Sequence, residues 1–300
     1  MSVGTEGLAR SVHTRLIQHA KRTGLDPTLV LTRFGIERFL YRLSASAHAE
    51  RFVLKGALLL AAWLGDAVRP TRDADFLGFG DLSEEALVRL FQDVCGQPVD
   101  SDGMTYDPDS IRVTEIREDS LYGGKRVTLW GALGAGRIRL QMDIGIGDVV
   151  EPPPEVLEYP VILDFPRPRL RTYRPETVVA EKLHAMVRLG AVNTRMKDFF
   201  DVYVLSETFD FDRRRLAKAV QATFERRGTT WPLSLPLALT PDFTTQGNRQ
   251  QWSAFLNRTG VAAPGDLAVV VQRLADFLGP VIMDGVVRGE RWAAGGPWGE

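Results

Sequence analysis

The stretch FVLKGALLL, residues 52–60, and the stretch RDADFLG, residues 72–78, decide how this chain is expected to fold. An apolar strand runs through Leu54 into Gly56, and a helix is predicted to begin near Ala57. A glycine at such a corner lets backbone N–H groups approach a phosphate, and the start of the helix adds free donors and positive dipole. An ordinary turn between a strand and a helix is the alternative interpretation.

Two acidic residues lie on one face of the second stretch. Because side chains alternate along a strand, Asp73 and Asp75 point to one face while Ala74 and Phe76 point to the other. Neighbouring carboxylates repel each other unless a cation neutralises them, and Mg²⁺ favours a few carboxylates together with phosphate oxygens. The pair therefore predicts a site for Mg²⁺ or Mn²⁺, with two solvated acids as the alternative.

A third acid is predicted on the strand RIRLQMDI, residues 137–144. Apolar residues alternate there with polar ones, and Asp143 stands on the polar face. Asp143 can be a plain surface acid. Beside the other pair, however, it would complete a site for two metals about 3.5–4 Å apart.

Two later helices carry charges at positions predicted to be buried. Pro175 suits the first position of a helix, and Lys182 falls in its apolar stripe, where a lone charge is costly without an anionic partner. Asp198 and Asp201 share a face of the next helix and need cationic partners there, for which Lys182, Lys197 or Arg195 are available. Snorkelling of Lys182 to solvent and structural bracing between the two helices are the alternatives.

The bulk composition limits the function classes. The chain has 300 residues, 44% of them hydrophobic, a formal net charge of -1 and one cysteine. No apolar run approaches the roughly 18 residues of a membrane span, and a single cysteine excludes an internal disulfide, so we expect a cytoplasmic protein without a membrane partner. Any nucleic-acid contact must come from a local patch. One candidate patch, which can equally be a solvated helix face, is Arg213, Arg214, Arg215, Lys218, Arg226 and Arg227.

Mixed helices and strands precede residue 150, and helical periodicity dominates after Pro175, which together predict an α/β (α+β) fold. We expect a core of a mixed sheet flanked by helices in residues 1–150, a Pro-rich connection over 151–174, and a mainly helical domain over 175–300. Expected helices lie near 6–22, 26–46, 57 onward, 83–94, 175–227 and 265–290, and expected strands at 51–54, 72–79, 111–117, 125–130 and 137–144. The glycine-rich piece 131–136 is interpreted as a hairpin connection.

Five motifs in this order resemble the nucleotidyltransferase toxins of the AbiEii/AbiGii type, a branch of the polymerase-β-like nucleotidyltransferase superfamily. They are VLKG (53–56), RPTRDAD (69–75), the strand ending in Asp143, TYRPETVVAEKLHA (172–185) and NTRMKDFFD (193–201). The resemblance covers about residues 52–205. Where the superfamily commonly has Gly-Ser and this family often Gly-Gly, this chain has Gly56-Ala57, so a hydroxyl contact to phosphate is absent.

The resemblance implies a role for each matched residue. Asp73 and Asp75 would bind the metal, joined more loosely by Asp143. Lys182 would contact the nucleotide phosphates, and Asp198 would complete the active site, so that the helical domain contributes to catalysis. The nucleotide contacts implied in full are Lys55, Gly56, Ala57, Arg72, Lys182 and Asp201.

The activity implied is metal-dependent transfer of a nucleoside monophosphate from an NTP to an RNA hydroxyl, with the 3′ end of the tRNA acceptor stem as substrate. The protein would then be the toxin of a toxin–antitoxin system, partnered by an antitoxin protein. Two alternatives remain open: transfer to a protein hydroxyl by the same site, and a non-catalytic relative that binds the antitoxin.

Overall fold

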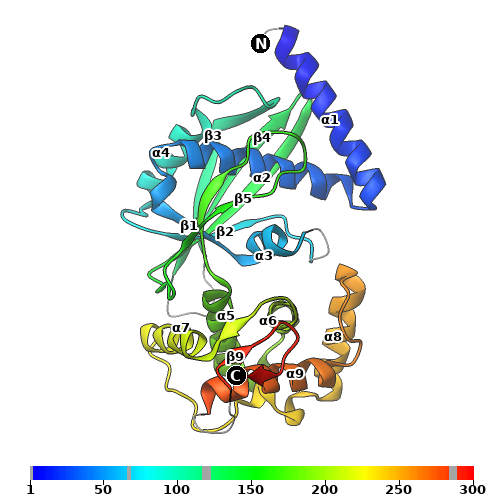
Figure 1. Cartoon of the computed structure of the whole chain (residues 1–300). Helices are drawn as coiled ribbons and strands as arrows, with labels where there is room; N and C mark the ends of the chain where they lie inside the picture. Colours follow the sequence, from blue (N-terminus) through cyan, green and yellow to red (C-terminus); the bar gives the residue numbers. More distant parts are fainter. Residues whose placement is uncertain (1–2, 66–68, 117–122, 284–288) are drawn as a thin grey trace. The chain divides into compact units, whose positions relative to one another are not determined.

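The computed structural model describes residues 3–65, 69–116, 123–283 and 289–300 (Figure 1). These residues form two compact units. The first unit comprises the described residues up to 65, residues 70–147 and residues 155–172; the second comprises Arg69, residues 148–154 and the described residues from Tyr173 onward.

The first unit combines helices with a mixed sheet. Its helices are α1 (Val3–Thr23), α2 (Pro27–Ala45), α3 (Gly56–Leu64) and α4 (Glu84–Cys95), and its strands are β1 (Phe52–Lys55), β2 (Ala74–Gly78), β3 (Met104–Ile116), β4 (Gly124–Leu133), β5 (Gly136–Ile146), β6 (Glu155–Glu158) and β7 (Arg169–Thr172). The start of α2 follows from its sequence, because Pro27 fixes the first helical position and the Asp26 carboxylate accepts a hydrogen bond from the Leu29 N–H at 2.8 Å.

The seven strands form one sheet in the order β3-β4-β5-β2-β1-β7-β6. Two of the neighbouring pairs, β2 with β5 and β1 with β7, are parallel. The hairpin of β4 and β5 closes with Leu133 opposite Gly136, so the connection expected over residues 131–136 is a hairpin whose strands reach further than predicted. The mixed α/β architecture predicted from the sequence is confirmed.

Helices α1, α2 and α4 cover one face of this sheet. Residues from them and the inward-facing strand residues form one apolar cluster, which includes Phe34, Phe39, Phe91, Leu140 and Met142. Phe39 stacks on Phe91 with ring centroids 5.5 Å apart. Because side chains alternate, the polar residues of β5 are left on the face away from this cluster.

The second unit is mainly helical, as expected. It contains α5 (Pro175–Leu189), α6 (Met196–Thr208), α7 (Arg213–Arg226), α8 (Gln246–Thr259) and α9 (Leu267–Ile282), with a small sheet of β8 (Phe211–Asp212), β9 (Arg291–Trp292) and β10 (Trp298–Gly299) in the order β10-β9-β8. Its buried residues include Phe199, Trp252, Phe277 and Trp292. None of the described helices is long and apolar enough to cross a bilayer.

Several elements differ from the sequence-based expectation. The region expected as a Pro-rich connection contains β6 and β7, and β7 pairs with β1 through Leu54 and Thr172. β3 begins at Met104, seven residues before the expected start at Ile111. The helix expected over 265–290 spans 267–282, and residues 284–288 lie outside the described residues. Helix α8 and the small sheet were not expected.

Candidate active site

Four charged residues form a row across four adjacent strands of the first unit. Lys55 at the end of β1 lies opposite Asp75 on β2, Asp75 lies opposite Asp143 on β5, and Asp143 lies opposite Arg126 on β4. Neighbouring strands are about 4.8 Å apart, so the two carboxylates are adjacent and each has a basic residue on its outer side. The parallel pairing of β2 with β5 places these two acids in register.

The three acids predicted from the sequence come together. Carboxylate oxygens of Asp73, Asp75 and Asp143, one from each residue, all lie within 4.8 Å of one another, and all three residues are half-buried. Asp73 precedes β2, and its carboxylate accepts a hydrogen bond from the Thr71 hydroxyl at 2.5 Å. Three hard oxygen donors this close match the ligand set that Mg²⁺ or Mn²⁺ prefers.

Arg126 was not identified from the sequence, yet it contacts one of these acids directly. Its Nε donates to Asp143 Oδ1 at 2.8 Å and its Nη2 donates to Asp143 Oδ2 at 2.7 Å. Gln141 adds a longer contact, with its Nε2 3.4 Å from Asp143 Oδ1. A bidentate pair fixes the plane of a carboxylate, and a carboxylate keeps further lone pairs that can face a cation.

The corner predicted at Gly56 adjoins the acids. Gly56 has a φ of +74°, and a Cβ placed on it would lie 1.9 Å from Asp75 Oδ2. The residue must therefore be glycine, both for its backbone conformation and for the space that the carboxylate occupies. Ala57 is buried, whereas Lys55 and Gly56 are half-buried. The exposed Arg72 lies with its Nη2 3.6 Å from Asp26 Oδ1. Nucleotide contacts by these residues stay predictions.

A second charged cluster lies in the second unit, where α5 meets α6. Lys182 Nζ is 2.9 Å from Asp198 Oδ1 and 2.6 Å from Asp201 Oδ2. Arg195 Nε donates to Asp198 Oδ2 at 2.7 Å. Arg69 donates through Nε and Nη2 to the two oxygens of Asp201, at 2.9 and 3.0 Å. Lys182 and Arg195 are therefore partners of the buried aspartates, as the sequence allowed, whereas Lys197 is exposed and the role of Arg69 was not anticipated.

Asp198 and Lys182 stabilise each other's charged form in this cluster. Burial acts to raise the pKa of Asp198, but the charges of Lys182 and Arg195 outweigh it and lower the pKa to about 2. Burial acts to lower the pKa of Lys182, but Asp198 and Asp201 outweigh it and raise the pKa above its ordinary value. Three cations surround two carboxylates, so the cluster carries a formal charge of +1 that suits an anionic ligand.

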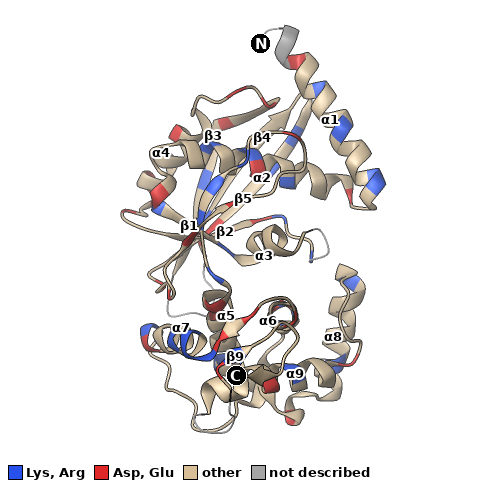
Figure 2. Cartoon of the chain, viewed as in Figure 1, with Lys and Arg blue, Asp and Glu red and all other residues tan. Residues whose placement is uncertain are grey.

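The basic patch considered on α7 is largely neutralised within the second unit. Four of its six residues form ion pairs: Arg214 with Glu290, Arg215 with Glu176, Lys218 with Glu151, and Arg227 with Asp148. Because paired guanidinium groups offer little net charge to a phosphate, the structure favours the interpretation of this segment as an ordinary charged surface. Figure 2 shows the basic and acidic residues of both units.

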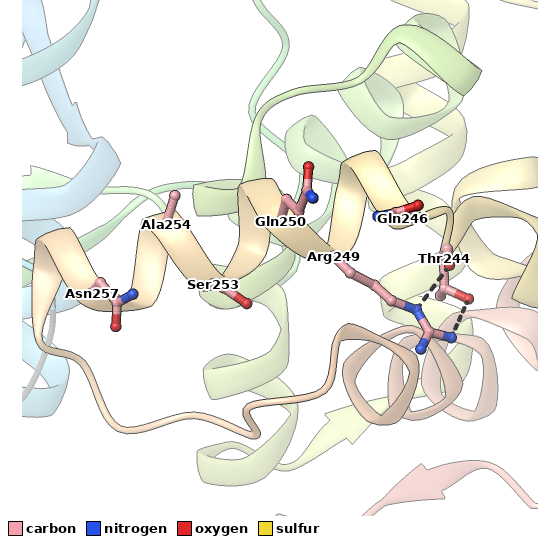
Figure 3. A pocket seen from close by; sticks show the side chains of 7 residues that line it. All are labelled: Thr244, Gln246, Arg249, Gln250, Ser253, Ala254 and Asn257. Carbon is pink, nitrogen blue, oxygen red and sulfur yellow. Dashed lines mark hydrogen bonds between the residues drawn. The ribbon is translucent and has the colours of Figure 1, made fainter.

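A surface pocket in the second unit is lined by one face of α8 (Figure 3). The lining residues are Thr244, Gln246, Arg249, Gln250, Ser253, Ala254 and Asn257. Arg249 Nε donates to the Thr244 carbonyl at 3.0 Å, which ties the start of the helix to the preceding loop. The lining offers neither a carboxylate nor a general base, so this pocket lacks the groups that metal-dependent chemistry requires.

Comparisons with known proteins agree with this geometry. The sequence profile of the family described as nucleotidyl transferase AbiEii toxin, type IV TA system, matches residues 38–274, which include every predicted site residue from Lys55 to Asp201. No curated protein matches the chain.

Two crystal structures are similar to this chain at low sequence identity. JHP933 from Helicobacter pylori is 15% identical with a TM-score of 0.50, over 85% of this chain and 95% of that one. A proposed nucleotidyltransferase from the same organism is 16% identical with a TM-score of 0.49, over 86% of this chain and 99% of that one. With most of its length matched by the family profile, the chain belongs to the AbiEii family of nucleotidyl transferase toxins, the enzymes of type IV toxin–antitoxin systems.

Proposed function

We propose that this enzyme transfers a nucleoside monophosphate from an NTP to an RNA hydroxyl, with the 3′ acceptor end of tRNA as substrate. The observation that supports the proposal most directly is the convergence of Asp73, Asp75 and Asp143, whose oxygens lie within 4.8 Å of one another. Three neighbouring carboxylates are costly without a cation, and a nucleotide triphosphate brings Mg²⁺ to such a site.

The triad would hold Mg²⁺ or Mn²⁺. When bound, the divalent ions would neutralise charge that develops on the phosphates and favour ionisation of the attacking hydroxyl. Asp73 and Asp75 would serve as metal ligands, and Asp143, held in orientation by Arg126, would serve as the third ligand. Lys55 lies opposite Asp75, and Gly56 and Ala57 begin α3. The backbone N–H groups at the start of this helix would bind the triphosphate.

The transfer step balances without a covalent enzyme intermediate. The RNA hydroxyl oxygen forms a bond to the α-phosphorus, the bond from that phosphorus to the bridging oxygen breaks, and pyrophosphate leaves. The hydroxyl proton passes to Asp143 or to solvent. No redox partner is needed for this step. The single cysteine, Cys95, is partly buried, and burial raises its pKa to about 12, so it is a poor nucleophile at neutral pH.

Lys182, Asp198 and Asp201 form the proposed contribution of the helical domain. The Lys182 ammonium is held by the two aspartates, and its cluster carries a formal +1 charge. We assign Lys182 to the triphosphate and Asp198 to holding its ammonium in place, with Arg72 as a further nucleotide contact.

The proposal is tested by incubating the full chain with each radiolabelled NTP, bulk tRNA and Mg²⁺. We expect labelled RNA that resists protease and is lost on RNase treatment. Asp73→Asn and Asp75→Asn should lower transfer by about 100-fold or more, because removing a metal ligand removes charge stabilisation from the transition state. Asp100→Asn, at an exposed acid on the segment after α4, is the matched control and should retain activity.

Other outcomes contradict the proposal in defined ways. Label that protease removes and RNase leaves would establish a protein acceptor. Absence of transfer with every NTP, together with absence of Mg²⁺-dependent NTP binding in calorimetry, would establish a non-catalytic protein. As the toxin of a two-component system, the wild-type chain should arrest bacterial growth when expressed alone, and the Asp73→Asn variant should not.

A further inference from the structure

One face of the β4–β5 hairpin carries exposed basic and aromatic side chains that the proposed chemistry does not use. On β5, Ile138, Leu140 and Met142 are buried against the helices, whereas Arg137 and Arg139 are exposed on the opposite face. We refer to Thr128, Trp130, Arg137, Arg139 and Gln141 as the β4–β5 polar face. It continues directly from Asp143 along the same strand.

The register of the hairpin orders these residues outward from the carboxylate triad. Asp143 lies opposite Arg126, Gln141 opposite Thr128, and Arg139 opposite Trp130. Each two-residue step along a strand covers about 6.7 Å, so Arg139 and Trp130 lie about 13 Å along the strand from Asp143, and Arg137 about 20 Å. A short ligand in an extended conformation, with one end at the carboxylate triad, would cover the distance from Asp143 to Arg137.

The side chains at the end of this face away from Asp143 are exposed and accessible to a ligand. Trp130 is 36% exposed, and the Arg137 guanidinium lies over its ring at 4.6 Å from the centroid. Arg139 has no hydrogen bond or ion pair to any residue in the described part of the chain. One acid, Asp107, lies opposite Trp130 on β3, so the arginines exceed the acids around the ring. The face is therefore positively charged next to an exposed indole.

We propose that the β4–β5 polar face binds the single-stranded 3′ end of the RNA acceptor and leads its terminal hydroxyl to Asp143. This inference rests on the function proposed above. A base stacks on Trp130 or on the outer plane of the Arg137 guanidinium, and Arg139 contacts the phosphate backbone. Unpaired bases stack on aromatic rings and guanidinium planes in this way, whereas a duplex keeps its bases stacked on each other.

The charge distribution favours this face over α7. Arg214 and Arg215 on α7 are paired with acids, whereas Arg139 has no such partner among the described residues and Arg137 contacts a neutral ring. A nucleic-acid backbone binds to Lys and Arg side chains that neutralise its phosphates and so release the counterions bound there. Guanidinium groups already paired with acids contribute little to that release.

The inference is tested by fluorescence anisotropy with a labelled, unstructured RNA of about 12 nucleotides, within the usual site size for single strands. The full chain is used without metal or NTP, so that binding is measured independently of catalysis. The Arg137→Gln/Arg139→Gln double variant should bind at least about 10-fold more weakly and lower the salt slope by about 0.7, because the phosphate contact of Arg139 is lost. Trp130→Ala should weaken binding by about 5- to 100-fold, and Trp130→Phe should restore most of it.

The matched control is Arg89→Gln. Arg89 is exposed on α4, which packs on the opposite face of the same sheet, so its substitution removes the same charge elsewhere in the unit and should change affinity less than about twofold. Thermal melting of each variant checks that it is folded. In the transfer assay, the double variant should raise the KM for RNA and leave the KM for NTP unchanged.

The outcomes separate this inference from the proposed function. If the wild-type chain transfers nucleotide to RNA while the double variant and Trp130→Ala bind and react like the wild type, the RNA path is refuted and the function stands. If the wild-type chain binds RNA through this face but transfers nothing, the surface is supported and the function fails. If the variants impair transfer to a protein in cell extract and leave RNA binding intact, the face serves a protein and the inference is overturned.

Discussion

The carboxylate of Asp75 fills the space in which residue 56 would carry its side chain. A Cβ on Gly56 would lie 1.9 Å from Asp75 Oδ2, 2.6 Å from Asp75 Cγ and 2.7 Å from Asp75 Cβ. The corner between β1 and α3 is therefore in direct contact with β2 at the acidic triad, and Gly56 is the point of contact. A change at position 56 acts on Asp75 before it acts on any ligand.

We expect Gly56→Ala to abolish nucleotide transfer while leaving the chain folded. The methyl group forces Asp75 out of the triad, and the positive φ adds strain of about 1 kcal/mol. Mg²⁺ binding measured by calorimetry should be lost together with transfer. The control is Gly24→Ala, because Gly24 has a φ of +72° but nothing within 4 Å of an added Cβ. Equal activity in the two variants would contradict the proposed role of Asp75.

Arg126 provides a second test because it is a cation already paired with Asp143 of the triad. In Arg126→Gln the three carboxylates lose this neutralising charge, so the metal-free protein should be less stable and Mg²⁺ should bind more tightly. We expect saturating Mg²⁺ to raise the melting temperature more in Arg126→Gln than in the wild type, and less in Asp143→Asn.

The neighbouring Lys125 supplies the matched control for this test. Its Nζ is 3.2 Å from Glu115, an exposed acid outside the triad. Lys125→Gln should therefore show the wild-type response to Mg²⁺. An Mg²⁺-induced shift in Arg126→Gln no larger than in the wild type would mean that the triad does not bind the ion through Asp143.

The Arg126–Asp143 pair shows which parts of the site could be predicted from the sequence and which could not. Strict alternation identifies the strand of Asp143, and the strand of Arg126 was also expected, so both residues could be placed on polar faces. Their pairing depends on the register, which the turn sets. The glycine-rich piece 131–136 allowed several turns, whereas the observed turn, with Leu133 opposite Gly136, is the one that places Arg126 opposite Asp143.

Elements held by distant contacts were harder to predict. β6 and β7 are each four residues long and lie among prolines. β7 is held in the sheet by pairing with β1, more than a hundred residues earlier in the chain. Arg69 similarly pairs with Asp201, 132 residues away, which no local pattern indicates. α8 was missed because its sequence QGNRQQWSAFLNRT is mostly polar, and only Asn248, Trp252 and Phe255 are buried. In contrast, the buried aspartates of α6 were predicted, since helical spacing alone places them on one face.

Asp201 is expected to contribute strongly to stability. It is fully buried and accepts from Arg69 and Lys182, so Asp201→Asn takes the paired carboxylate from Arg69 and leaves Lys182 with Asp198 alone. Breaking a buried pair in this way costs about 3–5 kcal/mol, which urea denaturation would measure. The Asp210–Arg291 pair is the exposed counterpart, and Asp210→Asn should destabilise the protein much less than Asp201→Asn. Similar losses in both variants would show that the buried cluster is not a structural anchor.

Glu37 gives the protein a pH dependence near neutrality. The residue lies on α2, its Oε2 accepts from the Ile162 N–H at 2.8 Å, and its Oε1 is 3.2 Å from Arg38. Burial raises the pKa of this carboxyl to about 7 despite the neighbouring Arg38 charge, from an ordinary value of 4.5. Between those two pH values the folded protein retains a proton that the unfolded chain has released.

The sign of the effect follows from this difference in bound protons. The free energy of unfolding should fall as pH rises from about 4.5 to about 7, by up to about 3 kcal/mol from this group. Glu37→Gln keeps an acceptor for Ile162 but cannot ionise, so its stability should decline less over that interval. Urea denaturation of both proteins at several pH values would measure the difference, with Glu84→Gln at an exposed position of α4 as the control. A constant difference between the wild type and Glu37→Gln across the interval would mean that Glu37 ionises alike in both states, because only a group whose pKa changes on folding can make stability depend on pH.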